Sequence, residues 1–441
     1  MATDTRPPSG PPSTPPPQYR KRLETEVRSV DPSAVAFTPS STSPDVHPYD
    51  SPTLSISSEE TFAALHHAAA LLLAQQPIAF PTETVYGLGA DATSDEAVAS
   101  IFTAKSRPSD NPLIVHIASL QQLRALLPEN KIPEFYLPLI HKFWPGALTI
   151  LLPLPSPPSL SKRVTATQPT FGARMPNHTI PLALSAMTGK PLAAPSANES
   201  GKPSPTAASH VFTDLQGRIP LILDAGGCSV GVESTVIDGF HSPPIILRPG
   251  GVSVEAIRAC GGIWASTIVA GESYDDNSTI SSTRKNSKSS SATSTADVDS
   301  SGPRAPGMKY KHYSPRAGVI LYEHGARPPA GRALIDPRLQ RIGVIRTRTW
   351  KPGSVEREVR AEEEIARRDG GELSPTEIFE VAIGESGEDI ARGLFAAMRE
   401  VDEKDVDVIH VEGIEEKEEG KAVMNRLYKA ASVVVRNVSA S

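Results

Sequence analysis

Hydroxyl groups, two carboxylates and two glycines are concentrated in one short segment of the chain, Pro81–Ala92, which reads P-T-E-T-V-Y-G-L-G-A-D-A. The apolar run P-I-A-F-P that leads into it predicts a short buried strand. Polar side chains at a strand end, beside glycines that let a ligand approach the backbone, are typical of a small-molecule site. The side chains available to such a ligand are Thr82, Glu83, Thr84 and Tyr86.

The same segment fits the dinucleotide fingerprint, because Gly87–Ala92 reads G-x-G-x-x-A. That motif needs a helix that begins on its last residues, so that a pyrophosphate lies at the helix N-terminus. Here the predicted helix cap is Thr93 or Ser94, which is too late for Gly89. The sequence also lacks a G-x-x-x-x-G-K-[ST] phosphate loop, so a nucleotide would have to bind by another design.

Cations and small polar residues adjoin other predicted elements. Lys105 and Arg107 follow a predicted helix, where they could be a solvated pair favoured by the helix dipole. Asn111 and an apolar strand ending near His116 come next, and cations beside a sheet edge suit a triphosphate. Similar residues adjoin later apolar runs in R-M-P-N-H (174–178), P-S-A-N-E-S-G (195–201), E-S-T (233–235) and R-P-G-G (248–251).

Several of these segments also have a purely structural interpretation. Arg174 could be a surface charge, and His178 could be a turn or core histidine. Residues 195–201 could be an ordinary polar turn, although their hydroxyls and N–H groups could also hold an anion. F-W-P-G at 143–146 is interpreted as a packed turn. The adjacent His66 and His67 point to different sides of a helix and cannot clamp a metal.

The elements that must position these residues form two predicted domains. Short apolar runs alternate with helical segments over residues 56–265, which predicts an α/β domain with a twisted mixed sheet. Residues 317–441 predict a smaller, Rossmann-like α/β domain with an open sheet. A Ser-rich linker, 266–316, joins them and ends in a candidate lid at 307–315. Residues 1–55, rich in Pro, Ser and Thr, predict a disordered tail, with order beginning at a capping box from Ser57 to Glu60.

Composition excludes several classes of protein. A net charge of -6 argues against a protein that binds nucleic acid mainly by electrostatic attraction. The only two cysteines, Cys228 and Cys260, favour a reducing compartment over a disulfide scaffold. No apolar run approaches the roughly 20 residues of a membrane span. We therefore expect a cytoplasmic enzyme; Glu24 and Glu26 disfavour a mitochondrial presequence, and a mitochondrial fraction stays open.

Six motifs in one order carry a family resemblance: P-T-E-T-V-Y-G-L-G, K-S-R-P-x-x-N-P-L-I-V-H, W-P-G-x-L-T, R-x-P-N-H, P-S-A-N-x-S-G and E-S-T-V-I-D. Together they resemble the threonylcarbamoyl-AMP synthase family, whose core is the YrdC-like domain. The segment G-M-K-Y-K-H-Y-S-P and the α/β domain after it look like the long form of that family. The resemblance covers residues 57–262 and 307–437.

The resemblance implies a reaction in which L-threonine, bicarbonate and ATP give threonylcarbamoyl-AMP and pyrophosphate, with Mg²⁺ as cofactor. It implies a downstream threonylcarbamoyl transferase that modifies adenosine in tRNA, with tRNA contact as a further expectation. Lys105 and Arg107 would be catalytic by neutralising phosphate charge. The residues similar to the family's threonine-binding positions are Thr84, His116, Arg174, Ala194 and Ser234. Those similar to its ATP-binding positions are Arg107, Asn111, Thr170, Ser196, Ser204, Arg248 and Tyr313.

Two other interpretations stay open at this stage. One is a carbamoyl-adenylate-forming maturation factor, a class that carries zinc-finger cysteines which this chain, with two cysteines, lacks. The other is an RNA-binding module without catalysis, whose binding would depend steeply on salt. The acidic net charge and the hydroxyls at strand ends favour small-molecule chemistry.

Overall fold

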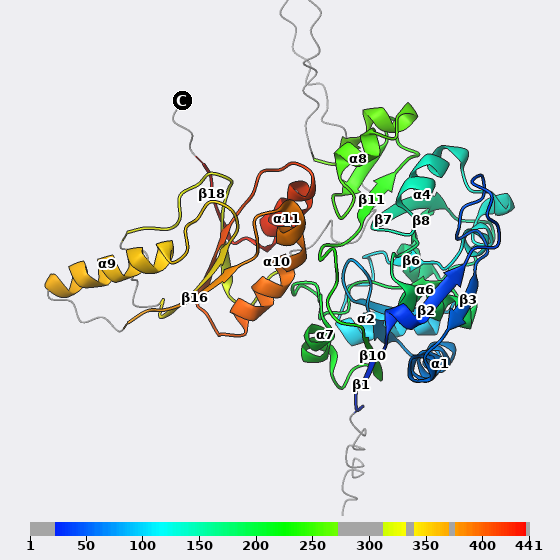
Figure 1. Ribbon diagram of the computed structural model, residues 1–441, viewed down its shortest axis with the longest axis horizontal. Helices are drawn as coiled ribbons and strands as arrows, with labels where there is room; N and C mark the ends of the chain where they lie inside the picture. Colours follow the sequence, from blue (N-terminus) through cyan, green and yellow to red (C-terminus); the bar gives the residue numbers. More distant parts are fainter. Residues whose placement is uncertain (1–22, 272–311, 332–338, 370–374, 438–441) are drawn as a thin grey trace, which may run out of the picture.

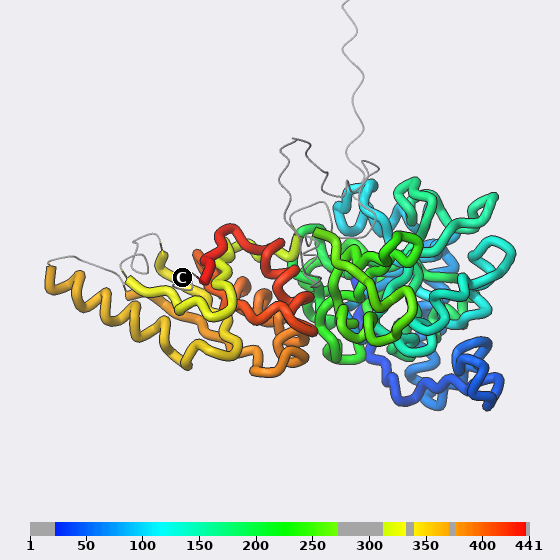
Figure 2. The backbone as a smooth tube through the Cα atoms, turned by 90° about the horizontal axis from the view of Figure 1, so that it is seen from above, coloured from blue at the N-terminus to red at the C-terminus, as the bar shows by residue number. Residues whose placement is uncertain are grey.

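The computed structural model describes residues 23–271, 312–331, 339–369 and 375–437. These residues form two lobes that lie side by side (Figure 1). The larger lobe contains the described residues up to 271, and the smaller one contains the elements from 318 onward. The view from above shows the same division, with α10 (Gly387–Asp402) and α11 (Glu419–Ala430) of the smaller lobe nearest the larger one (Figure 2).

The larger lobe is built on an eleven-stranded mixed sheet. The sheet contains parallel pairs such as β6 with β8 and antiparallel pairs such as β8 with β7. In spatial order the strands are β1 (Glu26–Ser29), β10 (Leu221–Asp224), β4 (Ile78–Phe80), β5 (Gly87–Asp91), β9 (Leu192–Ala193), β6 (Ile114–His116), β8 (Thr170–Arg174), β7 (Leu148–Pro153), β11 (Thr235–Asp238), β12 (Ile245–Arg248) and β13 (Ile268–Val269).

Helices cover the sheet and bury its apolar side chains in two main clusters. One cluster joins α1 and α6 to the sheet through Leu65, Leu72, Ile180 and Leu184. The other packs residues of α2, α4 and α8 against the central strands. The helices of this lobe are α1 (Glu59–Leu73), α2 (Asp95–Lys105), α3 (Leu120–Arg124), α4 (Leu137–Phe143), α5 (Lys162–Thr165), α6 (Thr179–Thr188), α7 (Ala208–Leu215) and α8 (Val254–Arg258), with short 3₁₀ turns η1 (Pro32–Ala34), η2 (Pro128–Asn130), η3 (Glu134–Tyr136) and η4 (Gly262–Ser266).

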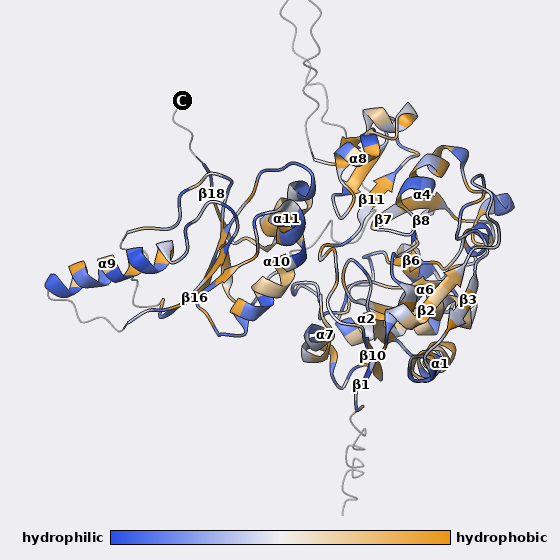
Figure 3. Ribbon diagram, in the orientation of Figure 1, coloured by the Kyte–Doolittle hydropathy of each residue, from blue (hydrophilic) through white to orange (hydrophobic). Residues whose placement is uncertain are grey.

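The smaller lobe has a five-stranded sheet in which every pair of strands is parallel. Its spatial order is β16 (Glu377–Ala382), β15 (Arg341–Arg346), β17 (Val408–Glu412), β14 (Gly318–Tyr322) and β18 (Val433–Val435). Among the described residues, three helices connect these strands: α9 (Ser354–Arg368), α10 (Gly387–Asp402) and α11 (Glu419–Ala430). Hydrophobic residues line the interior of both lobes, whereas α9 is largely hydrophilic and points outward (Figure 3).

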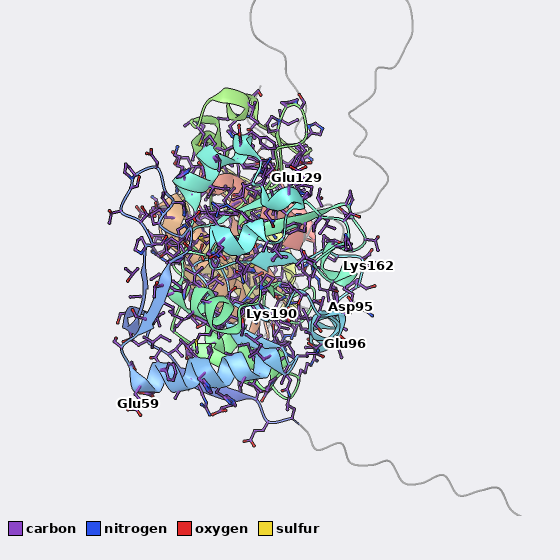
Figure 4. The ribbon with its side chains drawn as sticks, turned by 90° about the vertical axis from the view of Figure 1, so that its right-hand side faces the viewer. Glu59, Asp95, Glu96, Glu129, Lys162 and Lys190 are labelled. Carbon is purple, nitrogen blue, oxygen red and sulfur yellow. The ribbon has the colours of Figure 1, made fainter. Side chains whose placement is uncertain are left out.

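The face of the larger lobe that is turned away from the smaller lobe carries charged side chains, among them Glu59, Lys162 and Lys190 (Figure 4). No helix among the described residues is both long and apolar enough to cross a membrane.

The predicted fold class is confirmed, with a mixed sheet followed by an open parallel one. The prediction of a disordered tail over residues 1–55 is wrong from residue 26 onward. There β1 pairs with β10, and β2 (Val35–Thr38) pairs with β3 (Thr53–Ile56). Such short strands are held by distant partners rather than by an apolar pattern of their own. Residues 1–22 lie outside the described residues.

Other boundaries shift by smaller amounts. The helices predicted to begin at Ser57 and at Thr93 or Ser94 are capped by Ser58 and Ser94, whose hydroxyls accept the N–H groups of Thr61 and Ala97 at 3.2 Å. The sheet continues into β13, beyond the predicted domain end at 265. The candidate lid, 307–315, is described only from His312 onward.

The glycines of the opening motif belong to a strand, β5, that the sequence pattern did not predict. A Cβ on Gly89 would lie 2.3 Å from Cε1 of Phe80, on the neighbouring strand β4. This glycine is therefore required by the packing of the Phe80 ring rather than by the approach of a ligand. The rejection of a dinucleotide loop agrees with this geometry, because the helix begins only after Ser94.

Candidate active site

A cavity lies where several strand ends of the large sheet converge. His116 and Arg174 are the last residues of β6 and β8, and Arg248 is the last residue of β12. Ala194 follows β9, and Ser234 precedes β11. The residues that line the cavity are Thr82, Thr84, Val85, Gly87, Arg107, Ile114, His116, Arg174, Ala194, Pro195, Ser196, Glu233, Ser234, Arg248, His312 and Tyr313.

Arg174 and Thr84 form the polar centre of one side of the cavity. The Nη1 of Arg174 donates to Thr84 Oγ1 at 2.9 Å, and its Nε donates to the carbonyl of Gly146 at 3.1 Å. Its Nη2 forms a buried ion pair with Glu83 at 2.6 Å. A guanidinium has five N–H donors, so two remain for a ligand. Arg174 is therefore not the surface charge that its sequence context allowed.

His116 lies beside Arg174 and is buried. Burial lowers the pKa of His116 to about 3, and the neighbouring Arg174 acts in the same direction. The ring is therefore neutral near pH 7. A neutral imidazole with a lowered pKa is a weak general base, which favours a role in shaping the site over proton abstraction.

Arg248 and Ser234 join two neighbouring strand ends. The Nη2 of Arg248 donates to the Ser234 carbonyl at 2.8 Å and to its hydroxyl at 3.3 Å. The Ser234 hydroxyl lies 2.8 Å from Thr149 Oγ1. Burial lowers the pKa of Arg248, with Tyr313 and Glu233 opposing it. The pair presents a cation and a hydroxyl at the same wall of the cavity.

Arg107 supplies a second cation. Its Nη2 donates to the carbonyl of Pro112 at 3.2 Å, whereas its buried Nε has no acceptor in the part of the chain that the structure describes. Burial lowers the pKa of Arg107 to about 10, so it stays charged at neutral pH. A buried donor without an acceptor is costly, and an anionic oxygen would satisfy it.

Lys105 is buried but does not line the cavity. Its ammonium donates to the backbone carbonyls of Ser196 and Asn198 and to Asn198 Oδ1. Burial lowers its pKa well below the usual value, and Arg107 adds to the effect. In this structure Lys105 therefore holds the 196–198 loop, and Ser196 is the member of that loop that faces the cavity.

The linker contributes two aromatic rings to the cavity, His312 and Tyr313. The Tyr313 ring centroid lies 5.2 Å from that of Phe395 on α10. Its backbone φ of 65° is in the left-handed region, which is strained for a bulky residue and is often found at functional sites. Burial lowers the pKa of His312 to about 3, with Arg107 acting in the same direction, so this ring too is neutral.

Nine predicted residues line the cavity together: Thr84, Arg107, His116, Arg174, Ala194, Ser196, Ser234, Arg248 and Tyr313. The four other predicted residues, Lys105, Asn111, Thr170 and Ser204, do not line the cavity, and their predicted roles stay predictions. Lys105 and Ser204 lie behind it, since the Ser204 hydroxyl donates to Glu233 at 2.5 Å. The Asn111 side chain is buried beside Arg107, and Thr170 lines a separate small hollow between β6, β8 and α5.

Sequence reasoning missed Glu233 and His312 as lining residues, and Arg426 behind them. Glu233 was visible in the E-S-T motif, but the prediction there concerned the small hydroxyl residues rather than the carboxylate. Here it is buried, accepts from Ser204, and pairs with Arg426 Nε at 2.9 Å. No local signal marks Arg426, which reaches Glu233 from α11 of the other lobe.

A protein cage for Mg²⁺ would need several free carboxylates. The described residues contain no group of three His, Cys, Asp or Glu side chains that could hold a metal. Glu83 and Glu233 are already paired with Arg174 and Arg426. The residues of the cavity therefore fit a metal that is carried by the phosphates of a ligand better than a metal held by protein ligands alone.

Comparisons with known proteins cover both lobes. A family model described as "Telomere recombination" matches residues 70–250, and one described as "Threonylcarbamoyl-AMP synthase, C-terminal domain" matches residues 252–432. A threonylcarbamoyl-AMP synthase of Schizosaccharomyces pombe is 43% identical over 447 residues, which covers 95% of this chain and 100% of that protein. The chain belongs to the threonylcarbamoyl-AMP synthase family.

Other members of this family agree in sequence and in fold. A threonylcarbamoyl-AMP synthase of Pyrococcus abyssi is 42% identical over 371 residues, covering 82% of this chain and 93% of that protein. The crystal structure of P. abyssi Sua5 complexed with L-threonine has a TM-score of 0.66 at 36% identity, covering 93% of this chain and 99% of that chain. The predicted family and the predicted nucleotidyltransferase type of enzyme are confirmed.

Proposed function

We propose that this chain makes threonylcarbamoyl-AMP from L-threonine, bicarbonate and ATP and releases pyrophosphate. The observation that carries the proposal is that one cavity gathers three buried arginines beside several hydroxyl groups. Arg174 donates to Thr84, and Arg107 and Arg248 bring two further buried cations to the same cavity. The relative solved with L-threonine bound supports the amino-acid half of the site.

The threonine half would bind the amino acid through its carboxylate and hydroxyl. The two N–H groups that Arg174 retains can donate to the carboxylate, a charge-assisted contact. The hydroxyls of Thr84 and Ser234 and the neutral ring of His116 line the same cavity and would complete the threonine site. Ala194 leaves room beside them because its side chain is a single methyl group.

The nucleotide half would neutralise phosphate charge. Arg107 stays cationic at neutral pH and has a buried donor without an acceptor among the described residues. Arg248 and Ser196 face the same space. Lys105 would act indirectly, by fixing the loop that carries Ser196. We expect Mg²⁺ to be held by the phosphates and to supply further charge neutralisation.

The reaction needs no covalent intermediate on the enzyme. The amine of threonine bonds to the carbon of bicarbonate, giving an N-carboxylate with loss of water. One oxygen of that carboxylate then bonds to the α-phosphorus of ATP, while the bond from this phosphorus to the bridging oxygen of pyrophosphate breaks. The protein's contribution is to hold the two reactants in line and to stabilise the departing charge.

Tyr313 and His312 would shield the labile product from water. A separate threonylcarbamoyl transferase would then take the product to modify adenosine in tRNA. Direct tRNA contact and a cytoplasmic location belong to the same proposal. An RNA-binding module without turnover is the competing hypothesis, and it predicts no pyrophosphate.

The decisive experiment incubates the full chain with ATP, Mg²⁺, bicarbonate and L-threonine, measures pyrophosphate, and detects the adenylate by mass spectrometry. We expect pyrophosphate release that needs both threonine and bicarbonate. Release that is equally fast without threonine would refute the proposal. The matched control is Arg218→Ala, which removes a surface guanidinium that pairs with Glu199 outside the cavity.

A further inference from the structure

An arginine of the smaller lobe lies directly behind residues that line the catalytic cavity. Arg426, on α11, is fully buried. Its Nε donates to Glu233 Oε2 at 2.9 Å, and its Nη1 donates to the carbonyl of Pro249. Both acceptors belong to the larger lobe, so a single guanidinium ties α11 to two separate segments of the catalytic sheet.

Those two segments are the ones that present Ser234 and Arg248. Glu233 immediately precedes Ser234, and Pro249 immediately follows Arg248. They touch directly, because a Cβ on Gly250 would lie 2.3 Å from the carbonyl oxygen of Glu233. Arg426 therefore binds, on the side away from the cavity, the two strand ends that carry Ser234 and Arg248.

Arg426 also supports the linker residue that covers the cavity. Its guanidinium carbon lies 5.7 Å from the ring centroid of Tyr313, and Phe395 of α10 stacks near the same ring at 5.2 Å. Tyr313 has a strained backbone, which persists only where its surroundings hold it. Two helices of the smaller lobe supply that support.

From these contacts we infer that Arg426 is a positioning residue of the synthase. Its contacts with Glu233 and Pro249 hold Ser234 and Arg248 in the positions needed for the reaction. Its contact with Tyr313 holds that ring over the cavity. This inference rests on the proposed function. If it is correct, the C-terminal domain contributes to catalysis by positioning residues of the cavity. Arg426 does not line the cavity, so it acts through the residues that do.

The charge balance of the cluster agrees with this task. Burial alone would raise the pKa of Glu233, but Arg426, followed by Arg248, brings that pKa down to about 2. Without Arg426 the buried carboxylate would lose its nearest ion-pair partner and draw Arg248 toward itself. Arg248 would then be displaced from the position in which it faces the cavity.

A second ion pair between the lobes provides a matched control. Arg399 of α10 pairs with Asp214 of α7 at 2.7 Å, and both side chains are buried. Asp214 does not line the catalytic cavity. Asp214→Asn therefore also removes a buried ion pair between the two lobes, but it leaves the contacts of Arg426 with Glu233 and Pro249 in place.

The test compares full-length wild type, Arg426→Met, Arg426→Lys and Asp214→Asn at a temperature at which circular dichroism shows all four folded. ATP binding is measured by calorimetry, and pyrophosphate release gives kcat and KM. We expect Arg426→Met to lower kcat/KM for ATP about 10–100-fold, the scale on which a misplaced site loses rate. It should also weaken ATP binding, and Arg426→Lys should recover part of both.

We expect Asp214→Asn to lower the unfolding temperature while leaving ATP binding within about twofold of wild type. Equal losses of binding in Arg426→Met and Asp214→Asn, or wild-type behaviour of Arg426→Met, would overturn the inference. If Arg426→Met does not fold, Arg426→Lys, which keeps a positive charge beside Glu233, is compared with Asp214→Asn in its place. ATP binding can be measured without turnover, so the two proposals can fail separately. A wild-type chain that binds ATP without releasing pyrophosphate would refute the proposed function. The ATP affinities of the variants relative to wild type would still decide the role of Arg426.

Discussion

His116 and Arg174 are register partners on the neighbouring parallel strands β6 and β8. Residues in register on adjacent strands share one face of a sheet, so both side chains line the cavity. Burial, together with the nearby cation, lowers the pKa of His116 and keeps the imidazole neutral. The amino-acid half of the proposed site depends on this pair.

Arg174→Ala should raise the KM for threonine far more than the KM for ATP. Hydrogen bonds to a charged group contribute about 1.5–3 kcal/mol, which predicts a rise of about 10–100-fold. Arg174→Lys should recover only part, because an ammonium cannot donate to Thr84, Glu83 and a carboxylate in the fork geometry of a guanidinium. Steady-state kinetics with each substrate varied in turn provide the measurement. Equal increases in both KM values would contradict the assigned role.

His116 should make the protein less stable in acid. Its pKa is about 3 in the folded state, against 6.5 for a histidine in an unfolded chain, so below pH 6.5 the unfolded chain binds the additional proton. The stability that the neutral ring contributes is complete above pH 6.5 and falls as the pH drops toward 3. Between pH 7.5 and pH 5 the loss is about 2 kcal/mol. Urea unfolding at the two pH values should show a smaller difference for His116→Gln than for wild type, and an unchanged difference would rule out a neutral buried ring.

Lys105→Met should release the 196–198 loop, because the ammonium holds two of its backbone carbonyls. We expect the KM for ATP to rise by about tenfold, the effect of losing hydrogen bonds to a charged donor, with little change in the KM for threonine. Lys162→Met, which removes an exposed lysine on α5 (Figure 4), is the control. A loss of kcat with an unchanged KM for ATP would instead favour direct contact between Lys105 and the reacting phosphates.

Gly89→Ala should destabilise the larger lobe, because the new methyl group would meet the Phe80 ring at 2.3 Å. Overpacking of this kind costs about 1–3 kcal/mol. The Phe80→Leu/Gly89→Ala double variant should be more stable than the sum of the two single changes predicts. Gly227→Ala is a neutral control, because its Cβ would meet only Thr206 O at 3.9 Å. Wild-type stability of Gly89→Ala in urea unfolding would refute the packing explanation.

Tyr313→Ala should reduce product yield more than ATP consumption, because the adenylate would be exposed to hydrolysis when its cover is lost. Tyr313→Phe keeps the ring that packs on Phe395 and should remain close to wild type. Shortening the Ser-rich stretch at 278–301, which lies outside the described residues, should have little effect. The ratio of adenylate to pyrophosphate measures this coupling, and equal ratios in wild type and Tyr313→Ala would argue against a cover.

Much of the catalytic lobe could be predicted because its signals are local. Apolar runs such as 148–152 and 221–223 became β7 and β10, and the C-terminal runs became the parallel strands β14, β15 and β17. Hydroxyl and cationic residues beside those runs, among them Thr84 and Arg174, reached one cavity because strand ends gather at the edge of a sheet.

The sequence by itself determined the family, the two α/β domains and most of the residues that line the cavity, because side-chain patterns and motif order are properties of the chain alone. Only the tertiary structure decided that residues 26–56 join the fold, that Gly89 makes room for Phe80, and that Lys105 holds a loop instead of lining the cavity. It also revealed Arg426 behind Glu233. The physical reason is that these contacts depend on how separate elements pack against one another, and their free energy comes from burial and pairing that no local pattern records.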